Sequence, residues 1–104
     1  GNYIHMREGP DGMIYAIRWF DVKIVRFDPD APDKVETVAT GLTLPFNLAF
    51  DSKGQLYIIM GVDDSAAAVA RLALATGKPE ILATMHNLRF MMQLAGYLRG
   101  IGRG

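Results

Sequence analysis

Four places in the chain carry side chains that can take part in chemistry. They are His5, the trio Arg18, Trp19 and Asp21, the amide Asn47, and the adjacent pair Asp63 and Asp64. His5 can act as a general base because histidine titrates near neutral pH, yet no Ser or Asp is identifiably paired with it. The two adjacent carboxylates can contact a metal ion or a substrate, or they can simply be solvated in a turn. Chemistry therefore depends on which elements bring these groups together.

A further acidic stretch has the wrong spacing for a calcium loop. Asp28, Asp30 and Asp33 lie close together, but the stretch lacks the Gly and the terminal Glu of the EF-hand loop. The pattern favours a turn.

Composition excludes several function classes. The chain has 104 residues, with 11 basic and 11 acidic side chains and no cysteine. The absence of cysteine excludes disulfides, thiolate metal sites and a cysteine nucleophile. The balanced charge gives no reason to expect nucleic acid as a partner. No apolar run is long enough to span a bilayer. These features indicate a soluble protein and leave cytoplasm, periplasm and the extracellular space open.

The elements that must position these residues form a repeat. When Gly12 is aligned with Gly54, an offset of 42 residues, Tyr15 falls on Tyr57. Three extra residues in the second copy then match Arg26 with Arg71 at an offset of 45, and one deletion matches Glu36 with Glu80 at an offset of 44. A repeat of about 40 to 50 residues is typical of solenoids and propellers.

Period-2 patterning inside each copy predicts short strands. Each predicted strand is rich in β-branched or aromatic residues and is bounded by turn formers. The predicted strands cover residues 3–7, 13–18, 23–27, 35–39, 46–50, 55–60, 68–74 and 79–83. Four antiparallel strands in each repeat are typical of a β-propeller blade. The alternative is an arrangement outside the propeller class, in which the two sheets pack face to face.

The motifs of the two copies resemble the six-bladed propellers of the NHL and gluconolactonase-like superfamily. The resemblance is carried by "GPDGMIYAIRW", "KIVRFDPD", "VETVATGL" and "LPFNLAFDSKGQLYI". It covers residues 3 to about 85 and concerns structural positions. It implies an all-β fold made of two four-stranded antiparallel blades, with repeat 1 over residues 1–42 and repeat 2 over residues 43–85.

In such propellers, the loops between second and third strands gather near the central channel. The resemblance therefore implies that Arg18, Trp19 and Asp21 share a face with Asp63 and Asp64 as a ligand site. His5 and Asn47, which align with each other, are expected on the innermost strands. For Trp19, packing between blades is the alternative to a substrate platform.

Gluconolactonase-like proteins hold a divalent cation, so the resemblance implies a calcium, magnesium or manganese site if the protein is an enzyme. Asn47, Asp63 and Asp64 are the candidate ligands. The expected inner-strand motif has Asn where this chain has Phe46, which shifts Asn47 by one residue. Asn47 can instead cap backbone at a turn or strand end. No other cofactor is predicted.

The last segment does not resemble a third blade. Residues 86–104 carry Leu88, Met91, Met92, Ala95 and Leu98 at helical spacing. We predict a short C-terminal amphipathic α-helix that begins after Asn87 and ends in a Gly-rich tail from Gly100. The apolar side of this helix needs a covering surface.

Two blades are fewer than the four to eight of typical propellers. We therefore expect either a segment of a longer propeller or a protomer that assembles with copies of itself or with a larger protein. The favoured function is a non-catalytic interaction module. The alternatives are a metal-dependent lactonase or esterase and a propeller that binds small ligands or carbohydrate through Trp19 and Phe20.

Overall fold

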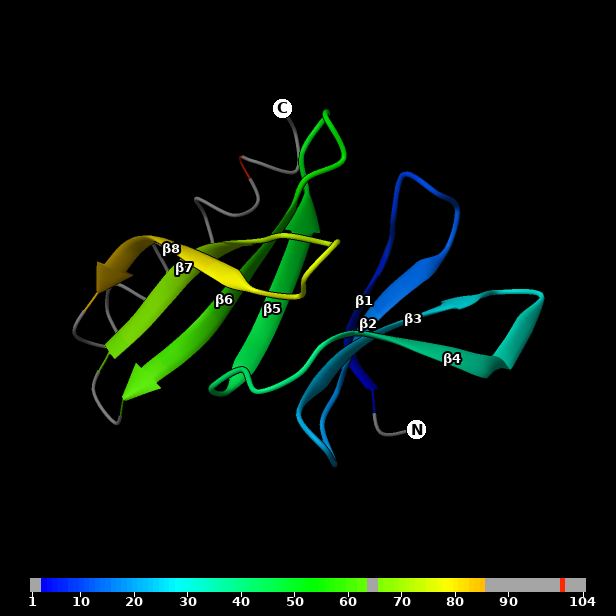
Figure 1. The fold of residues 1–104 in the computed structure, drawn as a ribbon, viewed down its shortest axis with the longest axis horizontal. Coiled ribbons are helices and arrows are strands. Elements are labelled where there is room, and N and C mark those ends of the chain that lie inside the picture. The colour runs from blue at the N-terminus through cyan, green and yellow to red at the C-terminus, as the bar shows by residue number, and fades with distance from the viewer. Residues whose placement is uncertain (1–2, 64–65, 86–99, 101–104) are drawn as a thin grey trace.

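The computed structural model describes residues 3–63, 66–85 and 100, and its secondary-structure elements are all β-strands (Figure 1). The strands are β1 Tyr3–Glu8, β2 Ile14–Arg18, β3 Lys23–Asp28, β4 Ala31–Ala39, β5 Pro45–Phe50, β6 Leu56–Asp63, β7 Ala66–Leu72 and β8 Pro79–Met85. They form two separate four-stranded sheets in the orders β1-β2-β3-β4 and β5-β6-β7-β8. Every pair of neighbouring strands is antiparallel. Over the described residues, the prediction of an all-β fold with two four-stranded antiparallel sheets is confirmed.

The repeat is visible in the first turn of each sheet. Gly12 donates its amide to the carbonyl of Gly9 at 3.0 Å, and Gly54 donates to the carbonyl of Asp51 at 3.1 Å. Both glycines adopt a left-handed conformation, with φ of 78° and 79°. Glycine reaches this conformation without the steric cost that other residues have. The matching glycines therefore fix two equivalent hairpins.

Strand β4 begins earlier than predicted. The stretch from Asp28 to Asp33 was predicted as a turn, but the Asp28 carboxylate accepts the amide of Asp30 at 2.8 Å. This bond closes a tight turn, so pairing resumes at Ala31, opposite Asp28. Pro32 lacks an amide hydrogen and is tolerated because β4 lies at the edge of its sheet.

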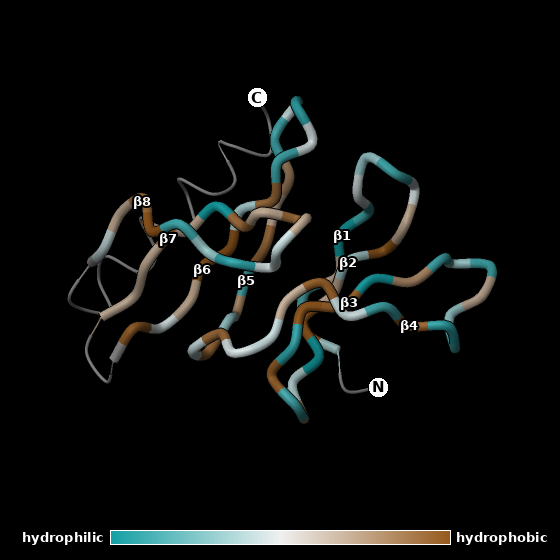
Figure 2. The backbone as a smooth tube through the Cα atoms, in the orientation of Figure 1, coloured by the Kyte–Doolittle hydropathy of each residue, from teal (hydrophilic) through white to brown (hydrophobic). Residues whose placement is uncertain are grey.

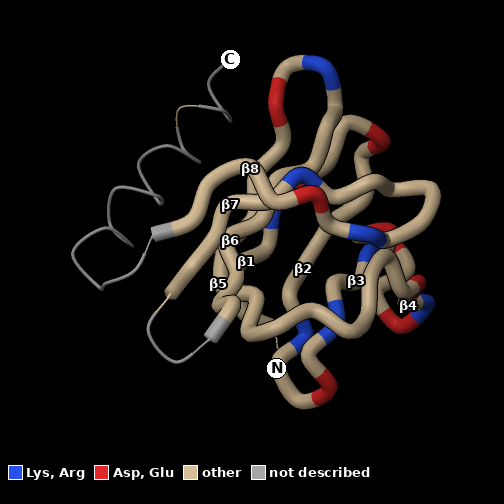
Figure 3. Tube along the Cα trace, turned by 60° about the vertical axis from the view of Figure 1, so that its left-hand side comes forward, with Lys and Arg blue, Asp and Glu red and all other residues tan. Residues whose placement is uncertain are grey.

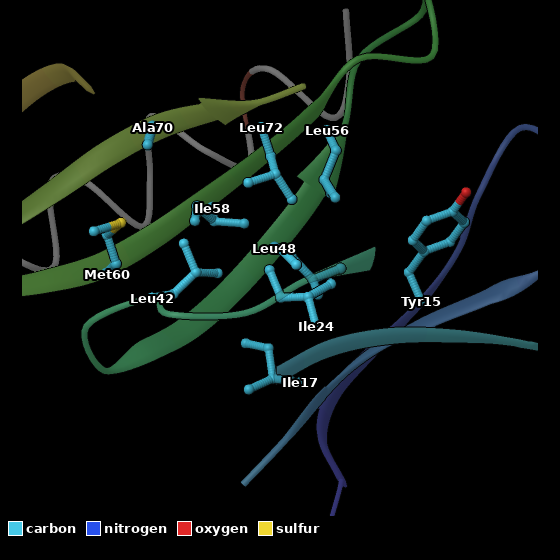
Figure 4. Close-up of a cluster of buried hydrophobic side chains, with 11 residues drawn as sticks. Tyr15, Ile17, Ile24, Leu42, Leu48, Leu56, Ile58, Met60, Ala70 and Leu72 are labelled. Carbon is cyan, nitrogen blue, oxygen red and sulfur yellow. The ribbon is translucent and has the colours of Figure 1, made fainter. Parts of the chain in front are cut away.

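The main core lies between the two sheets (Figure 4). Its buried members are Tyr15, Ile17, Ile24, Ala39, Leu42, Leu48, Leu56, Ile58, Met60, Ala70 and Leu72. Tyr15 also meets Phe50 edge-on, with ring centroids 4.8 Å apart. One face of each sheet is thus buried against the other sheet.

The two sheets use different faces for this contact. In the 42-residue alignment Tyr15 corresponds to Tyr57, and Ala16 corresponds to Ile58. Tyr15 packs into the core between the sheets, whereas Tyr57 lies in a separate cluster on the far side of β5–β8. Conversely, Ile58 packs into that core, whereas Ala16 lies on the far side of β1–β4. The two sheets therefore pack through non-equivalent faces. This is a head-to-tail arrangement of the two repeats.

Each sheet consequently has a second apolar face. The outer face of β1–β4 comprises Tyr3, Met6, Ile14, Ala16, Val25, Phe27 and Val35. The outer face of β5–β8 comprises Phe46, Ala49, Tyr57, Ile59, Ala67, Val69 and Ala83. Met6 belongs to the first set because it pairs directly with Ala16, and directly opposed residues share a face. Hydrophobic stretches accordingly run along the strands of both sheets (Figure 2).

Two close contacts with backbone carbonyl groups join the sheets. Arg7 on β1 donates its Nε hydrogen to the carbonyl of Leu48 on β5 at 3.2 Å. The turn before β8 lies against the end of β4, where a Cβ atom added to Gly77 would be 2.6 Å from the carbonyl oxygen of Val38. Gly77 also has a φ of 70°. Only glycine satisfies both the conformation and the close approach.

The predicted C-terminal helix falls on residues 86–99, which lie outside the described ranges. Within the described part of the chain, no helix has the length and apolar character needed to cross a membrane.

Candidate functional site

The predicted ligand site centres on the loop between β2 and β3. Strand β2 ends at Arg18 and β3 begins at Lys23, so residues 19–22 make the connection. Val22 donates its amide to the carbonyl of Trp19 at 3.3 Å and has a φ of 53°. A left-handed conformation is strained for a β-branched residue, so the loop is held in an unfavourable geometry by its surroundings.

An ion pair provides part of that restraint. The guanidinium of Arg18 donates two hydrogen bonds to the carboxylate of Asp21, at 3.0 Å from Nε and 2.8 Å from Nη2. The ammonium of Lys23 lies 3.6 Å from the same carboxylate. The bonds from Arg18 are the main cause of a lowered pKa of Asp21. Arg18 and Asp21, which were predicted to share a ligand site, do lie together in the structure. Their charged groups, however, are bonded to each other.

The aromatic residues of this loop are exposed. Trp19 is 47% exposed and Phe20 is 66% exposed. The Phe20 ring lies over the guanidinium of Arg18, with 5.1 Å from Cζ to the ring centroid. Arg18 pairs with Tyr3, which belongs to the outer face of β1–β4. Phe20 therefore extends that outer face beyond the end of the strand.

Asn47 and His5 lie on β5 and β1, the strands through which the two sheets approach each other. The side-chain oxygen of Asn47 accepts the backbone amide of Leu48 at 2.9 Å. Asn47 thus bonds to backbone, as in the capping alternative, but it lies within β5 rather than at a turn or strand end. His5 is exposed, has a φ of 50° and is the extra residue where the register between β1 and β2 shifts. Its position is a β-bulge, a feature that redirects side chains.

The acidic pair falls at the limit of the described ranges. Asp63 ends β6, where its backbone pairs with Ala66, and Asp64 lies outside the described residues. Among the residues that the structure describes, no group of three His, Cys, Asp or Glu side chains can hold a metal ion. The cation site implied by the resemblance stays a prediction.

No protein-family model matches the chain, and no curated protein matches it. The resemblance to NHL and gluconolactonase-like propellers therefore stays a prediction. A hollow of about 360 Å³ is lined by the ends of β6, β7 and β8, including Leu56 and Leu72, and by the turn between β7 and β8, including Lys78. It contains none of the predicted site residues.

Sequence reasoning missed a polar network on β1–β4. The hydroxyl of Tyr15 donates to the Asp11 carboxylate at 2.7 Å and accepts from Arg26 at 3.0 Å. Arg26 also donates to Glu36 on β4 at 2.7 Å. Burial is the largest cause of a raised pKa of the Tyr15 hydroxyl. The network ties the first turn to three consecutive strands.

A corresponding network lies on β5–β8. The hydroxyl of Tyr57 donates to Asp51 at 3.1 Å, and Arg71 donates to Glu80 at 2.6 Å. Asp51 also accepts the amides of Lys53 and Gln55, each at 2.9 Å. The sequence signal was available, because the tyrosines, arginines and glutamates all coincide in the repeat alignment. Because the same residue types recur at matching positions of both sheets, we interpret these networks as a repeated structural feature rather than as a reactive site.

Proposed function

We propose that the chain is a propeller-derived, non-catalytic interaction module. Its docking surface is the outer face of β1–β4, and its partner is a further four-stranded sheet supplied by a second copy of the chain. The observation that carries the proposal is that the matching face of β5–β8 already docks a sheet within the chain.

The correspondence runs residue by residue. In the 42-residue alignment Met6, Ile14 and Ala16 fall on Leu48, Leu56 and Ile58. The latter three pack against β1–β4 in the core between the sheets. The outer face of β1–β4 thus has the pattern of a surface that receives a sheet. Head-to-tail contacts of this kind can be repeated by another copy.

At the rim of this surface two side chains are exposed, whereas Ala16 and Val25 at its centre have no exposed surface. Met6 is 58% exposed, and Phe20, which extends the face over Arg18, is 66% exposed. Fully burying a side chain of this size contributes about 1.5–3 kcal/mol. Because about 1.4 kcal/mol changes an equilibrium constant tenfold, these two residues can change an association constant on the order of 100-fold or more.

The repeat also supports assignment of the sheets as propeller blades. Both are four-stranded meanders, and they approach each other through their first strands, β1 and β5. Successive blades of a propeller also pack with non-equivalent faces, as these sheets do. The metal-dependent lactonase and the ligand-binding propeller stay predictions, since no contact within the described residues favours either.

The test is the solution mass of the purified chain by light scattering over a dilution series. We expect a mass above that of the monomer at high concentration. Met6→Lys places a charge on the exposed part of the docking surface and is expected to weaken association on the order of tenfold or more. Leu74→Lys is the matched control, since Leu74 is 40% exposed on the turn between β7 and β8.

A chain that remains monomeric at every concentration would overturn self-assembly and would leave the larger partner as the remaining prediction. Equal weakening by Met6→Lys and Leu74→Lys would place the contact elsewhere.

A further inference from the structure

The outer face of β5–β8 repeats the face through which β1–β4 packs into the core between the sheets. The residues of β1–β4 that pack there include Ile4, Tyr15, Ile17, Ile24 and Ala39. The repeat alignment places Phe46, Tyr57, Ile59, Val69 and Ala83 at the same positions, with offsets of 42, 45 and 44 residues. All five of these residues belong to the outer face of β5–β8. This face therefore has the pattern of a surface that docks onto another sheet.

The outer face of β1–β4 repeats the other half of the same contact. The residues of β5–β8 that pack into the core include Leu48, Leu56, Ile58, Ala70 and Leu72. Their counterparts are Met6, Ile14, Ala16, Val25 and Phe27, which all lie on the outer face of β1–β4. Ala16 is smaller than its counterpart, whereas Val25 and Phe27 are larger than theirs. Such changes offset one another, and a core tolerates substitutions that conserve its total volume.

Polar replacements are confined to the rim of the repeated contact. The core residues Met13, Phe50 and Met60 correspond to Gln55, Glu8 and Arg18. The charge of Arg18 is compensated by its two bonds to Asp21. Phe50 meets Tyr15 inside the chain, so Glu8 is expected opposite Tyr57, whose neighbour across the strands is Arg71. A polar rim around an apolar centre is usual for interfaces between proteins.

We propose that the sheet received by the outer face of β1–β4 is β5–β8 of a second copy of the chain, which docks through its own outer face. This inference rests on the proposed function, because it names the partner of the same docking surface. Among the described strands, only β1 and β2 contact β5–β8, and they do so beside the core between the sheets. The contact joins unlike faces, so each chain binds one neighbour through each of its two outer faces.

The first turn of each sheet supplies a specific pair of positions for a test. Inside the chain, a Cβ atom added to Gly54 would lie 3.6 Å from the Cβ atom of Pro10. Disulfides join residues whose Cβ atoms are about 3.5–4.5 Å apart. At the offset of 42 residues, Gly54 corresponds to Gly12 and Pro10 corresponds to Ser52. Because the proposed contact repeats the one inside the chain, Gly12 of one copy is expected beside Ser52 of the next.

The test measures disulfide formation between two single variants, Gly12→Cys and Ser52→Cys, in a chain that has no cysteine of its own. We expect a mixture of the two variants to form a linked pair on the order of tenfold faster than either variant alone, because the contact raises the effective concentration of the two thiols. The matched control is one chain with Pro10→Cys and Gly54→Cys, which should form its disulfide within the monomer. This control also places a cysteine at a glycine with a left-handed conformation.

A second measurement leaves both glycines unchanged. A spin label on Ser52→Cys is mixed with unmodified chain that carries the isotope label, so that only contacts between copies are observed. We expect the label to broaden the amide NMR signals of Gly12 and Met13 more strongly than those of Asp21 and Val22, which follow the opposite end of β2. Uniform or absent broadening at concentrations where the chain is associated would overturn the proposed partner.

The solution mass distinguishes this inference from the proposed function. A mass that rises with concentration, together with Gly12→Cys linking mainly to itself, would indicate a pair that uses the same face twice. That result would overturn β5–β8 as the partner sheet and leave the interaction module intact. A chain that stays monomeric at every concentration would overturn both self-assembly and this partner.

Discussion

The two sheets share one topology and differ in charge. The strands of β1–β4 carry nine Asp, Glu, Lys or Arg residues, whereas those of β5–β8 carry three. The charged positions accordingly gather on β3, β4 and the turns and are sparse along β5–β8 (Figure 3). Since the hydrogen-bonded frame is the same, the difference reflects the environment that each sheet occupies.

Burial follows the same division. Five consecutive residues of β7, Ala66 to Ala70, are buried, so both faces of that strand are shielded from water. In β4 only Ala39 is buried. The inner strands of β5–β8 are thus more deeply buried than those of β1–β4, whereas the edge strands β4 and β8 are both largely exposed. Two repeats with the same backbone topology can thus differ in how deeply their strands are buried.

The largest expected effect is the loss of packing between the sheets. Ile58→Ala removes a fully buried side chain from the shared core and is expected to lower the free energy of unfolding by about 2–5 kcal/mol. Met6→Ala on the exposed outer face is expected to change the stability of the monomer by less than about 0.5 kcal/mol. Chemical denaturation at low protein concentration measures both. Similar values for the two variants would contradict the assignment of faces.

Alanine substitutions at two glycines distinguish the cost of a strained φ angle from the cost of a steric clash. Gly77→Ala adds a strained φ, which costs about 1–2 kcal/mol, and a backbone clash with Val38, which costs about 1–3 kcal/mol. Gly12→Ala has only the first cost, because nothing lies within 4 Å of its added Cβ. Thermal unfolding of the two variants should rank Gly77→Ala as the more damaging. The opposite order would mean that the turn before β8 does not lie on β4.

The polar networks are expected to contribute less. Tyr15→Phe removes a hydroxyl that donates to Asp11 and accepts from Arg26, at an expected cost of about 0.5–1.5 kcal/mol per hydrogen bond. Tyr57→Phe removes the corresponding hydroxyl on β5–β8. Denaturant unfolding of both variants measures the contribution of each network to the free energy of unfolding. If the networks are equivalent, the two costs agree within a factor of about two.

The smallest expected effect is on acid stability. Amide hydrogen bonds, the one from Gln55 foremost, lower the pKa of Asp51 below its ordinary value of 3.8. A carboxylate with a lowered pKa stabilises the fold above that ordinary value, and this stabilisation is lost as the pH falls through the folded pKa. Asp51→Asn should therefore lose stability at neutral pH and show a weaker dependence on pH below about 4. An unchanged acid profile would contradict this role for Asp51.

Much of the fold was predictable from patterning. Alternating apolar residues and matching turn glycines placed all eight strands, because these features act locally. The face that each sheet buries was not predictable, since period-2 alternation defines two faces without ranking them. The early start of β4 was missed because it depends on one bond between Asp28 and Asp30.

Less of the candidate site was predictable. The loop after β2 was located correctly, and Arg18 and Asp21 do meet. Their mutual pairing was not expected, because sequence places residues in one loop without saying which atoms bond. The hydrogen-bond networks of Tyr15 and Tyr57 were missed because their members are distant in sequence and become neighbours only across paired strands.

The most direct test of the docking surface is a methyl NMR dilution series on chain labelled at its methionine methyl groups. Met6 lies on the exposed outer face of β1–β4, whereas Met60 is buried between the sheets and serves as an internal reference. We expect the Met6 signal to shift with protein concentration in step with the solution mass, while the Met60 signal stays constant. A rising mass with an unchanged Met6 signal would contradict the claim that this face receives a second sheet.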